Sequence, residues 1–213
     1  MATADFEVPK IPGMKLIPLE NQSAEAYLLK GKLSEKQSEE ITQYLEEVIL
    51  PLLDERPEIK IFGRECRVNR NFAFFSQESE GYRFSGNIAR SKDEMPEKLN
   101  ELMKSINRKF ETNFNGILVN YYPDGKSNIG RHADQMGGLN VSDGVLSISF
   151  GATRTFNLYP KRGEKLVKSL NLNNGSIVWM AGSKFQKTFR HEVPVESSVI
   201  HPRFSLTFRS YNK

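Results

Sequence analysis

The chain has 213 residues and a mass of 24.3 kDa, and its 38% hydrophobic and 26% charged residues are ordinary values for a globular protein with a full core. No apolar run approaches the roughly 18 residues of a membrane-spanning helix, and the first ten residues lack the apolar stretch of a signal peptide. The single cysteine, Cys66, excludes an internal disulfide and is typical of a reducing compartment. We therefore expect an intracellular monomer of the nucleus or cytoplasm, without a membrane partner, whose one thiol is buried and inert.

The formal net charge of +4 is divided unevenly along the chain. Residues 1–60 carry 7 Lys and Arg against 12 Asp and Glu, whereas residues 61–213 carry 23 against 14. A basic body favours a polyanionic partner such as nucleic acid, although scattered solvated charge explains the same excess. We predict two parts: an N-terminal arm and helical extension over residues 1–60, and a main domain over residues 61–213.

Two helices are predicted after a loosely packed arm, residues 1–23, which has three prolines and no clear period. Ser34 and Gln37 form a capping box, and apolar residues then recur at helical spacing as far as Pro51. The apolar residues of this first helix are Ile41, Leu45, Val48 and Ile49. The second helix runs from about Pro96 to Phe110, and its core stripe comprises Leu99, Leu102, Met103, Ile106 and Phe110.

After Asn113 the apolar residues alternate with a period of two, which is typical of strands. Pro-Asp-Gly and Asn-Asn-Gly turn signals separate several of these segments. The predicted strands have the sequences ILVNYY, VLSISF, RTFNLY, SIVWMA and RFSLTFR. Short strands without intervening helices favour a mainly β fold with flanking helices, a sandwich or jelly roll, over a parallel α/β sheet.

The triplet His132-Ala133-Asp134 carries the first chemical signal. In an extended segment its imidazole and carboxylate project to the same side, so the two groups can share a cation. A second histidine would complete the two-His-one-carboxylate set of non-haem Fe(II) oxygenases, although zinc hydrolases use similar ligands and a surface pair has the same spacing. His191 follows a predicted strand and is the candidate partner, with a structural histidine as the alternative; His201 lies in a predicted loop.

The C-terminal predicted strand alternates polar and apolar side chains. Phe204, Leu206 and Phe208 share one face, and the opposite face carries Arg203, Ser205, Thr207 and Arg209. An edge strand with a hydrated face explains this pattern, but two arginines also suit a dicarboxylate because guanidinium binds carboxylate through two parallel hydrogen bonds. Asn120 and Tyr122, two residues apart, can face the same ligand. A 2-oxo dicarboxylic acid that chelates ferrous iron and binds an arginine would join the metal ligands and the arginine-bearing strand in one site.

The motifs NYYPDG, IGRHADQ, LSISFGATRTFNLY, NNGSIVWMAG, FRHEVP and PRFSLTFR occur in the order found in the AlkB family. The chain therefore resembles AlkB-type Fe(II)/2-oxoglutarate dioxygenases over roughly residues 64–211. YRFSG, at 82–86, is similar to the element with which AlkB-type dealkylases hold a flipped base.

The resemblance implies a double-stranded β-helix (jelly roll) that demethylates alkylated bases in DNA or RNA and releases formaldehyde, with Fe(II) as cofactor and 2-oxoglutarate and dioxygen as co-substrates. The implied iron ligands are His132, Asp134 and His191. The implied 2-oxoglutarate contacts are Asn120, Tyr122, Arg203 and Arg209. One arginine would hold the distal carboxylate and the other would lie nearer the metal, so Arg209→Ala is expected chiefly to weaken 2-oxoglutarate affinity. The implied substrate contacts are Tyr82, Phe84, Ser85 and Gln135, although ordinary strand packing equally explains the two aromatic residues.

The sequence departs from the AlkB-family pattern at one point that bears on the choice of substrate. Nucleic-acid repair members usually have acidic residues after the iron aspartate, whereas Gln135 and Met136 follow Asp134 here. The preference for a cationic base is therefore open, and a dioxygenase acting on a protein or small molecule is the alternative. A non-enzymatic jelly-roll binding module is the further alternative. Candidate phosphate contacts are Arg64, Arg67, Arg70, Arg83, Arg90, Lys184, Lys187 and Arg190.

Overall fold

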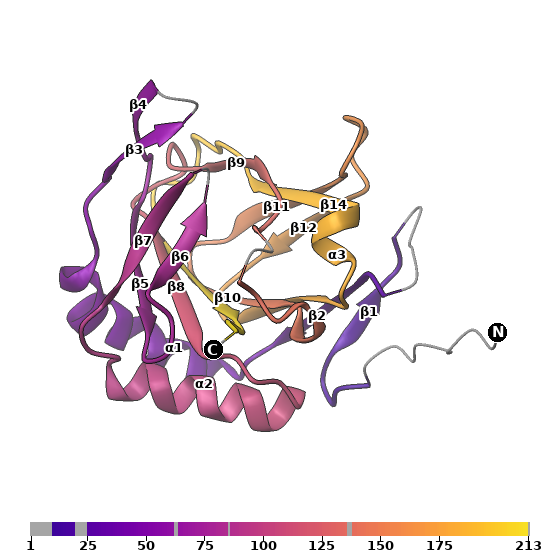
Figure 1. Ribbon diagram of the computed structural model, residues 1–213, viewed down its shortest axis with the longest axis horizontal. Helices are drawn as coiled ribbons and strands as arrows, with labels where there is room; N and C mark the ends of the chain where they lie inside the picture. Colours follow the sequence, from indigo (N-terminus) through magenta and orange to yellow (C-terminus); the bar gives the residue numbers. More distant parts are fainter. Residues whose placement is uncertain (1–9, 20–24, 62–63, 85, 136–137, 213) are drawn as a thin grey trace.

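Three layers form the molecule: two helices, a nine-stranded sheet and a four-stranded sheet. Figure 1 shows α1 and α2 beneath the large sheet, with the smaller sheet on its other side. The helices are α1 (Glu35–Tyr44), α2 (Glu97–Phe110) and the short α3 (Phe185–Thr188). None of the helices in the described part of the chain is both long and apolar enough to cross a membrane. The computed structural model describes residues 10–19, 25–61, 64–84, 86–135 and 138–212.

The large sheet has the strand order β1-β2-β13-β10-β15-β8-β5-β7-β6. Its strands are β1 (Lys15–Ile17), β2 (Tyr27–Lys32), β5 (Asn71–Ser76), β6 (Gly81–Phe84), β7 (Asn87–Lys92), β8 (Gly116–Tyr122), β10 (Val145–Gly151), β13 (Ser176–Ala181) and β15 (Arg203–Arg209). Strand β15 pairs antiparallel with β10 on one side and with β8 on the other. The alternative of an edge strand with a hydrated face is therefore wrong, because β15 is central and all seven of its residues are buried.

The small sheet has the order β12-β11-β14-β9. Its strands are β9 (Ile129–His132), β11 (Arg154–Pro160), β12 (Lys168–Leu172) and β14 (Phe189–Val193). A separate hairpin, β3 (Glu58–Ile61) and β4 (Arg64–Arg67), projects from the body in Figure 1. All five strands expected after Asn113 are present, and the mainly β fold with flanking helices is confirmed.

Helix α1 begins at the predicted capping box. The Ser34 hydroxyl accepts the Gln37 amide N–H, and the Gln37 side chain accepts the Ser34 amide N–H, both at 3.3 Å. After Tyr44 the chain widens into a π turn and then a short 3-10 turn that ends at Leu52. Because of that widening, Leu45 and Ile49 are buried, whereas Val48 is 44% exposed and does not join the predicted apolar stripe.

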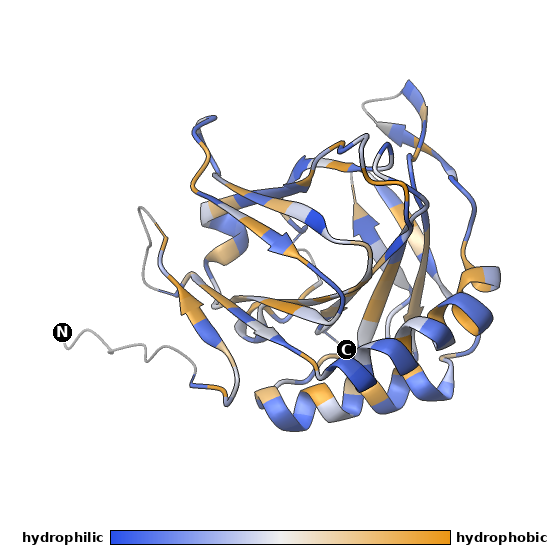
Figure 2. Ribbon diagram, turned by 180° about the vertical axis from the view of Figure 1, so that it is seen from behind, coloured by the Kyte–Doolittle hydropathy of each residue, from blue (hydrophilic) through white to orange (hydrophobic). Residues whose placement is uncertain are grey.

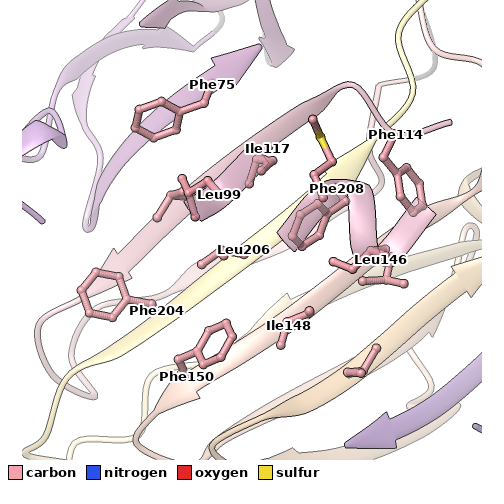
Figure 3. Close-up of a cluster of buried hydrophobic side chains, with 14 of the residues drawn as sticks. Phe75, Leu99, Phe114, Ile117, Leu146, Ile148, Phe150, Phe204, Leu206 and Phe208 are labelled. Atoms are coloured by element: carbon pink, nitrogen blue, oxygen red, sulfur yellow. The ribbon is translucent and has the colours of Figure 1, made fainter. Parts of the chain in front are cut away.

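The main core lies between α2 and the large sheet. Leu99, Met103, Ile106 and Phe110 of α2 are buried there, as predicted, and Leu102 is partly buried against the same cluster. Figure 3 shows Leu99 beside the apolar side chains of β8, β10 and β15. In Figure 2 most of the α2 ribbon is coloured hydrophilic, with hydrophobic residues recurring at intervals along it. This amphipathic pattern explains how the helix covers one face of the sheet.

The segments before residue 70 differ from two expectations. Part of the predicted loose arm forms β1, which pairs with β2, and β2 in turn pairs with β13 over six positions. The boundary at residue 60 stays a prediction, with β2 and α1 both packed on the main body. Cys66 is exposed rather than buried, because it lies on the projecting β3–β4 hairpin.

Candidate metal centre and co-substrate cavity

A cavity of about 430 Å³ lies between the two sheets. Most of the predicted site residues line it, from both sheets and from the β6 segment: Tyr82, Phe84, Asn120, Tyr122, His132, Gln135, His191, Arg203 and Arg209. Asp134 is buried beside His132. Ser85 lies outside the described residues. The fold thus brings together in one space residues that are up to 127 positions apart in the sequence.

Two histidines and one aspartate meet where β9 pairs with β14. His132 and His191 are register partners across these strands, and their ring centroids are 4.3 Å apart. The Nε2 atom of His132 lies 3.7 Å from Oδ1 of Asp134. One potential ligand atom from each of the three residues lies within 4.8 Å of the others, so the three can contact one cation. His201, the third histidine, is exposed and takes no part in this cluster.

Neighbouring groups fix the orientation of these side chains. The Nδ1 atom of His132 donates to the carbonyl oxygen of Gly130 at 2.8 Å, which leaves Nε2 free as a ligand atom. The amide N–H of Asp134 donates to Oε1 of the buried Gln186 at 2.9 Å. Phe156 stacks on the His191 ring at 5.3 Å. Gln186 was not identified from the sequence, because nothing in its local pattern distinguishes it from any other helical glutamine.

Electrostatics favour the metal-binding protonation states. Burial, together with neighbouring His132, lowers the pKa of His191 to about 3. Burial would raise the pKa of Asp134, but the adjacent Arg209 guanidinium opposes burial, and that pKa lies below its usual range. Neutral imidazoles and an ionised carboxylate are the forms that bind a divalent metal.

The donor set fits ferrous iron. Oδ1 of Asp134 and Nδ1 of His191 are buried and have no hydrogen-bond partner among the described residues. Two imidazoles and one carboxylate leave coordination positions open, as non-haem Fe(II) oxygenases require. The unpaired Oδ1 atom is therefore the kind of buried polar atom that a bound cation would satisfy.

Arg203 is a deeply buried residue of the cavity wall. Its side chain is 2% exposed, and its Nη2 donates to Oγ of Ser149 at 2.8 Å. Its Nε and Nη1 have no protein partner within the described part of the chain. The guanidinium carbon lies 5.1 Å from the ring centroid of Tyr122. A buried guanidinium with free N–H groups fits an anionic ligand, and the distal carboxylate of 2-oxoglutarate supplies one.

Arg209 has a different environment from Arg203. Its Nε and Nη2 both donate to Oδ2 of Asp134, at 3.0 and 2.8 Å, and both residues are buried. The Arg209 guanidinium also lies 4.4 Å from the ring centroid of Tyr82. Arg209 therefore holds the aspartate of the metal cluster. Its expected contact with 2-oxoglutarate stays a prediction.

An ion-pair network on β9, β14 and β11 holds the outer face of the small sheet. Arg131, next to His132, contacts Glu192, next to His191, through Nε at 3.3 Å, and it also pairs with Glu164. The same carboxylate of Glu192 accepts from Tyr159 at 2.8 Å and from Asn157 at 3.1 Å. Because β9 has only two register pairs with β14, this network adds a second link between the strands that carry the histidines. Its members are scattered in the sequence, so sequence patterns could not reveal it.

Tyr82 and Phe84 make one end of the cavity aromatic. Tyr82 and Phe84 stack with their ring centroids 5.6 Å apart and an interplanar angle of 13°. Burial raises the pKa of Tyr82 to about 12, so its hydroxyl stays protonated. Both rings line the cavity and also pack in a small apolar cluster with Phe74 and Val68. Packing within the protein is therefore confirmed, and their contact with a substrate stays a prediction.

Several of the predicted phosphate contacts already have protein partners. Arg190 bonds to Glu164 and to two backbone carbonyls, Lys184 pairs with Glu25, and Arg67 pairs with Glu58. Arg70 donates to Oδ1 of Asn120 at 2.7 Å. A role for these residues in phosphate binding stays a prediction.

The sequence matches the 2OG-Fe(II) oxygenase superfamily over residues 25–209. The chain belongs to this superfamily. It is 30% identical over 205 residues to the DNA oxidative demethylase ALKBH2 of Homo sapiens, covering 93% of this chain and 77% of that protein. It is also 30% identical over 181 residues to ALKBH2 of Bos taurus, of whose length it spans 64%. The alpha-ketoglutarate-dependent dioxygenase alkB homolog 3 of Mus musculus is 36% identical over 106 residues, or 46% of this chain and 36% of that protein.

These relatives confirm the resemblance to the AlkB family within the superfamily. A solved structure of OsALKBH1 has a TM-score of 0.55 at 17% identity and covers 91% of this chain and 100% of that chain, which confirms the jelly-roll fold. A 2OG-Fe(II) oxygenase uses Fe(II), 2-oxoglutarate and dioxygen, so the cofactor and co-substrates are as expected. The assignment of individual residues to them stays a prediction.

Proposed function

We propose that this protein oxidatively demethylates alkylated bases in DNA or RNA and releases formaldehyde. The names of its ALKBH2 relatives support this activity. The main structural support is that one cavity adjoins three groups of side chains. These are the His132–Asp134–His191 cluster, Arg203 with its free N–H groups, and the Tyr82–Phe84 aromatic pair. A metal, an anionic co-substrate and a flat base can therefore occupy neighbouring parts of one space.

Each group in the cavity has a separate task in this proposal. His132, Asp134 and His191 would hold Fe(II), and Arg209 would keep the Asp134 carboxylate ionised and oriented. Arg203 would bind the distal carboxylate of 2-oxoglutarate through Nε and Nη1, with Asn120 and Tyr122 on the adjoining strand β8 as further contacts. When bound, Fe(II) with 2-oxoglutarate and dioxygen supplies the oxidation of an N-methyl group, whose hydroxylated product loses formaldehyde.

The base would enter at the aromatic end. Extrusion of a base from its stack costs a few kcal/mol, and less for a damaged or single-stranded base. Stacking on the rings of Tyr82 and Phe84 would offset part of that cost, since stacking of a base on an aromatic ring contributes about 1–3 kcal/mol. Gln135, which lines the cavity, would contact the edge of the base. The basic character of residues 61–213 would favour the encounter with a polyanion.

Formaldehyde release from methylated oligonucleotides tests the proposal. We expect turnover only with Fe(II) and 2-oxoglutarate, and we expect His132→Ala to abolish it. His201→Ala is the matched control, because His201 is exposed and lies outside the cavity lining, and it should retain turnover. Absence of turnover on methylated DNA and RNA, single- and double-stranded, would contradict the proposal. Consumption of 2-oxoglutarate stimulated only by nucleic-acid-free extract would instead support a protein or small-molecule substrate.

A further inference from the structure

The charges around the cavity are not balanced at its aromatic end. Four arginines contribute to the cavity wall: Arg70, Arg131, Arg203 and Arg209, of which Arg131 directs its guanidinium to the ion pairs of the outer face. Arg209 pairs with Asp134, and Arg131 pairs with Glu164 and Glu192. In the proposed function, the co-substrate carboxylate neutralises Arg203. Arg70 differs, because none of the described carboxylates lies within ion-pair distance of it, and its Nε bonds to the neutral amide of Asn120.

Arg70 lies beside the aromatic end. Its guanidinium carbon is 5.9 Å from the ring centroid of Phe72, and the Phe72 ring contacts Phe84 edge-on at 5.7 Å. Phe84 in turn stacks on Tyr82. Arg70 lines the same cavity as this aromatic pair and as His132.

Acidic side chains do not offset this charge in the cavity wall. No Asp or Glu of the described chain is among the residues that line the cavity, and the buried Asp134 carboxylate is already paired with Arg209. The next three residues along the chain, Gln135, Met136 and Gly137, are uncharged in the sequence. A cationic base that enters this end would lose its hydration and gain no opposite charge in return.

We propose, on the basis of the proposed demethylation, that the pocket selects neutral N-methylated bases that carry ring carbonyls, namely N3-methylthymine, N3-methyluracil and N1-methylguanine. In these bases a carbonyl oxygen adjoins the methylated nitrogen, and the Nη groups of Arg70 can donate to such an oxygen. N1-methyladenine has no carbonyl beside its methylated nitrogen, and N3-methylcytosine has one carbonyl and one amino group there. Both bases carry a positive charge that Arg70 repels. Arg70 is thus a specificity-determining residue.

The test compares oligonucleotides of one sequence that carry one of these five bases each. We expect kcat/KM for the neutral bases to exceed that for the cationic bases by at least about tenfold, because one unscreened charge contact near a protein surface is of this size or larger. Gln135→Asp, which adds a carboxylate at the cavity wall, should shift the ratio toward the cationic bases. Arg70→Gln should shift it in the same direction, with melting temperature and KM for 2-oxoglutarate as controls for its bond to Asn120.

The possible outcomes separate the two proposals. Equal or faster turnover of the cationic bases by the unmodified protein would overturn the selectivity but leave demethylation intact. A ratio that neither Gln135→Asp nor Arg70→Gln changes would also overturn it, and the first variant decides the matter if the second does not fold. Turnover of none of the five bases would remove the proposed function itself and the selectivity with it.

Discussion

The two faces of strand β15 are both buried, but only one of them has all its side-chain groups in contact with partners inside the protein. Phe204, Leu206 and Phe208 face the helices and make apolar contacts that are complete within the protein. Figure 3 shows these side chains among those of β8, β10 and α2. The opposite face carries Arg203 and Arg209, whose guanidinium groups retain N–H groups without partners in the described structure. In the proposed function, the apolar face contributes stability, Arg203 binds the co-substrate, and Arg209 both stabilises the fold and holds Asp134.

The largest effect is expected at the Arg209–Asp134 pair. Arg209→Met leaves a buried carboxylate without its partner, so we expect the free energy of unfolding to fall by about 3–5 kcal/mol, measured by urea unfolding of the metal-free protein. Metal affinity should fall as well, because the carboxylate is no longer held. Asp134→Ala should be similarly destabilising, because it leaves the buried Arg209 guanidinium without its partner. A stable Arg209→Met variant with normal metal affinity would show that the pair does not organise the site.

Arg203→Met should separate binding from stability. We expect 2-oxoglutarate affinity to fall by about 2–5 kcal/mol, roughly 30- to 5,000-fold, because a buried charged hydrogen-bond partner is removed. The melting temperature of the ligand-free protein should stay the same or rise, since the variant removes a buried cation with unpaired N–H groups. Calorimetric titration of Mn(II)-loaded protein measures the first quantity. Unchanged affinity would remove Arg203 from the co-substrate site.

Leu206→Ala is the matched change on the opposite face. The side chain is fully buried in the main core, so we expect a loss of about 2–5 kcal/mol in the free energy of unfolding. Affinity for 2-oxoglutarate should remain within about twofold of the unmodified protein, because distant sites behave almost independently. A large loss of affinity in a folded Leu206→Ala protein would show that the two faces are coupled.

The smallest effect is expected on the outer face of the small sheet. Glu192→Gln weakens the link between β14 and β9, and Mn(II) affinity should fall by up to about fivefold, because partly exposed ion pairs contribute only about 0.2–1 kcal/mol. Affinity for 2-oxoglutarate in saturating Mn(II) should not change. Glu164→Gln, which removes a more exposed partner of Arg131, is the control and should have a smaller effect.

Local sequence patterns predicted the parts of the site that a single segment defines. The alternation from Arg203 to Arg209 correctly separated the two faces of β15, and the His132–Asp134 spacing placed both side chains on one side. These features depend only on the two-residue period of a strand. His191 was correctly expected to approach His132. That expectation came from the order of the AlkB-like motifs along the chain and not from a local pattern.

Contacts between residues that are far apart in the sequence could not be predicted from local sequence patterns. Asp134 and Arg209 are 75 residues apart, and neither local pattern signals the other. The same holds for Gln186, which orients Asp134 across 52 residues. Cys66 was wrongly expected to be buried, because composition indicates that a thiol is usually internal but cannot show that its hairpin projects from the body. The strands β5, β6 and β7 were missed because the clear alternating pattern begins only after them.

The most direct test of the central claim, that the metal cluster and the Arg203 end form one site, is the coupling between two ligands. 2-Oxoglutarate affinity is measured by calorimetry with and without saturating Mn(II), in the unmodified protein, in His191→Ala and in the His201→Ala control. We predict that Mn(II) raises the affinity by at least about tenfold in the unmodified protein and in the control, and that His191→Ala abolishes this gain. An affinity for 2-oxoglutarate that is the same with and without Mn(II) would contradict the account.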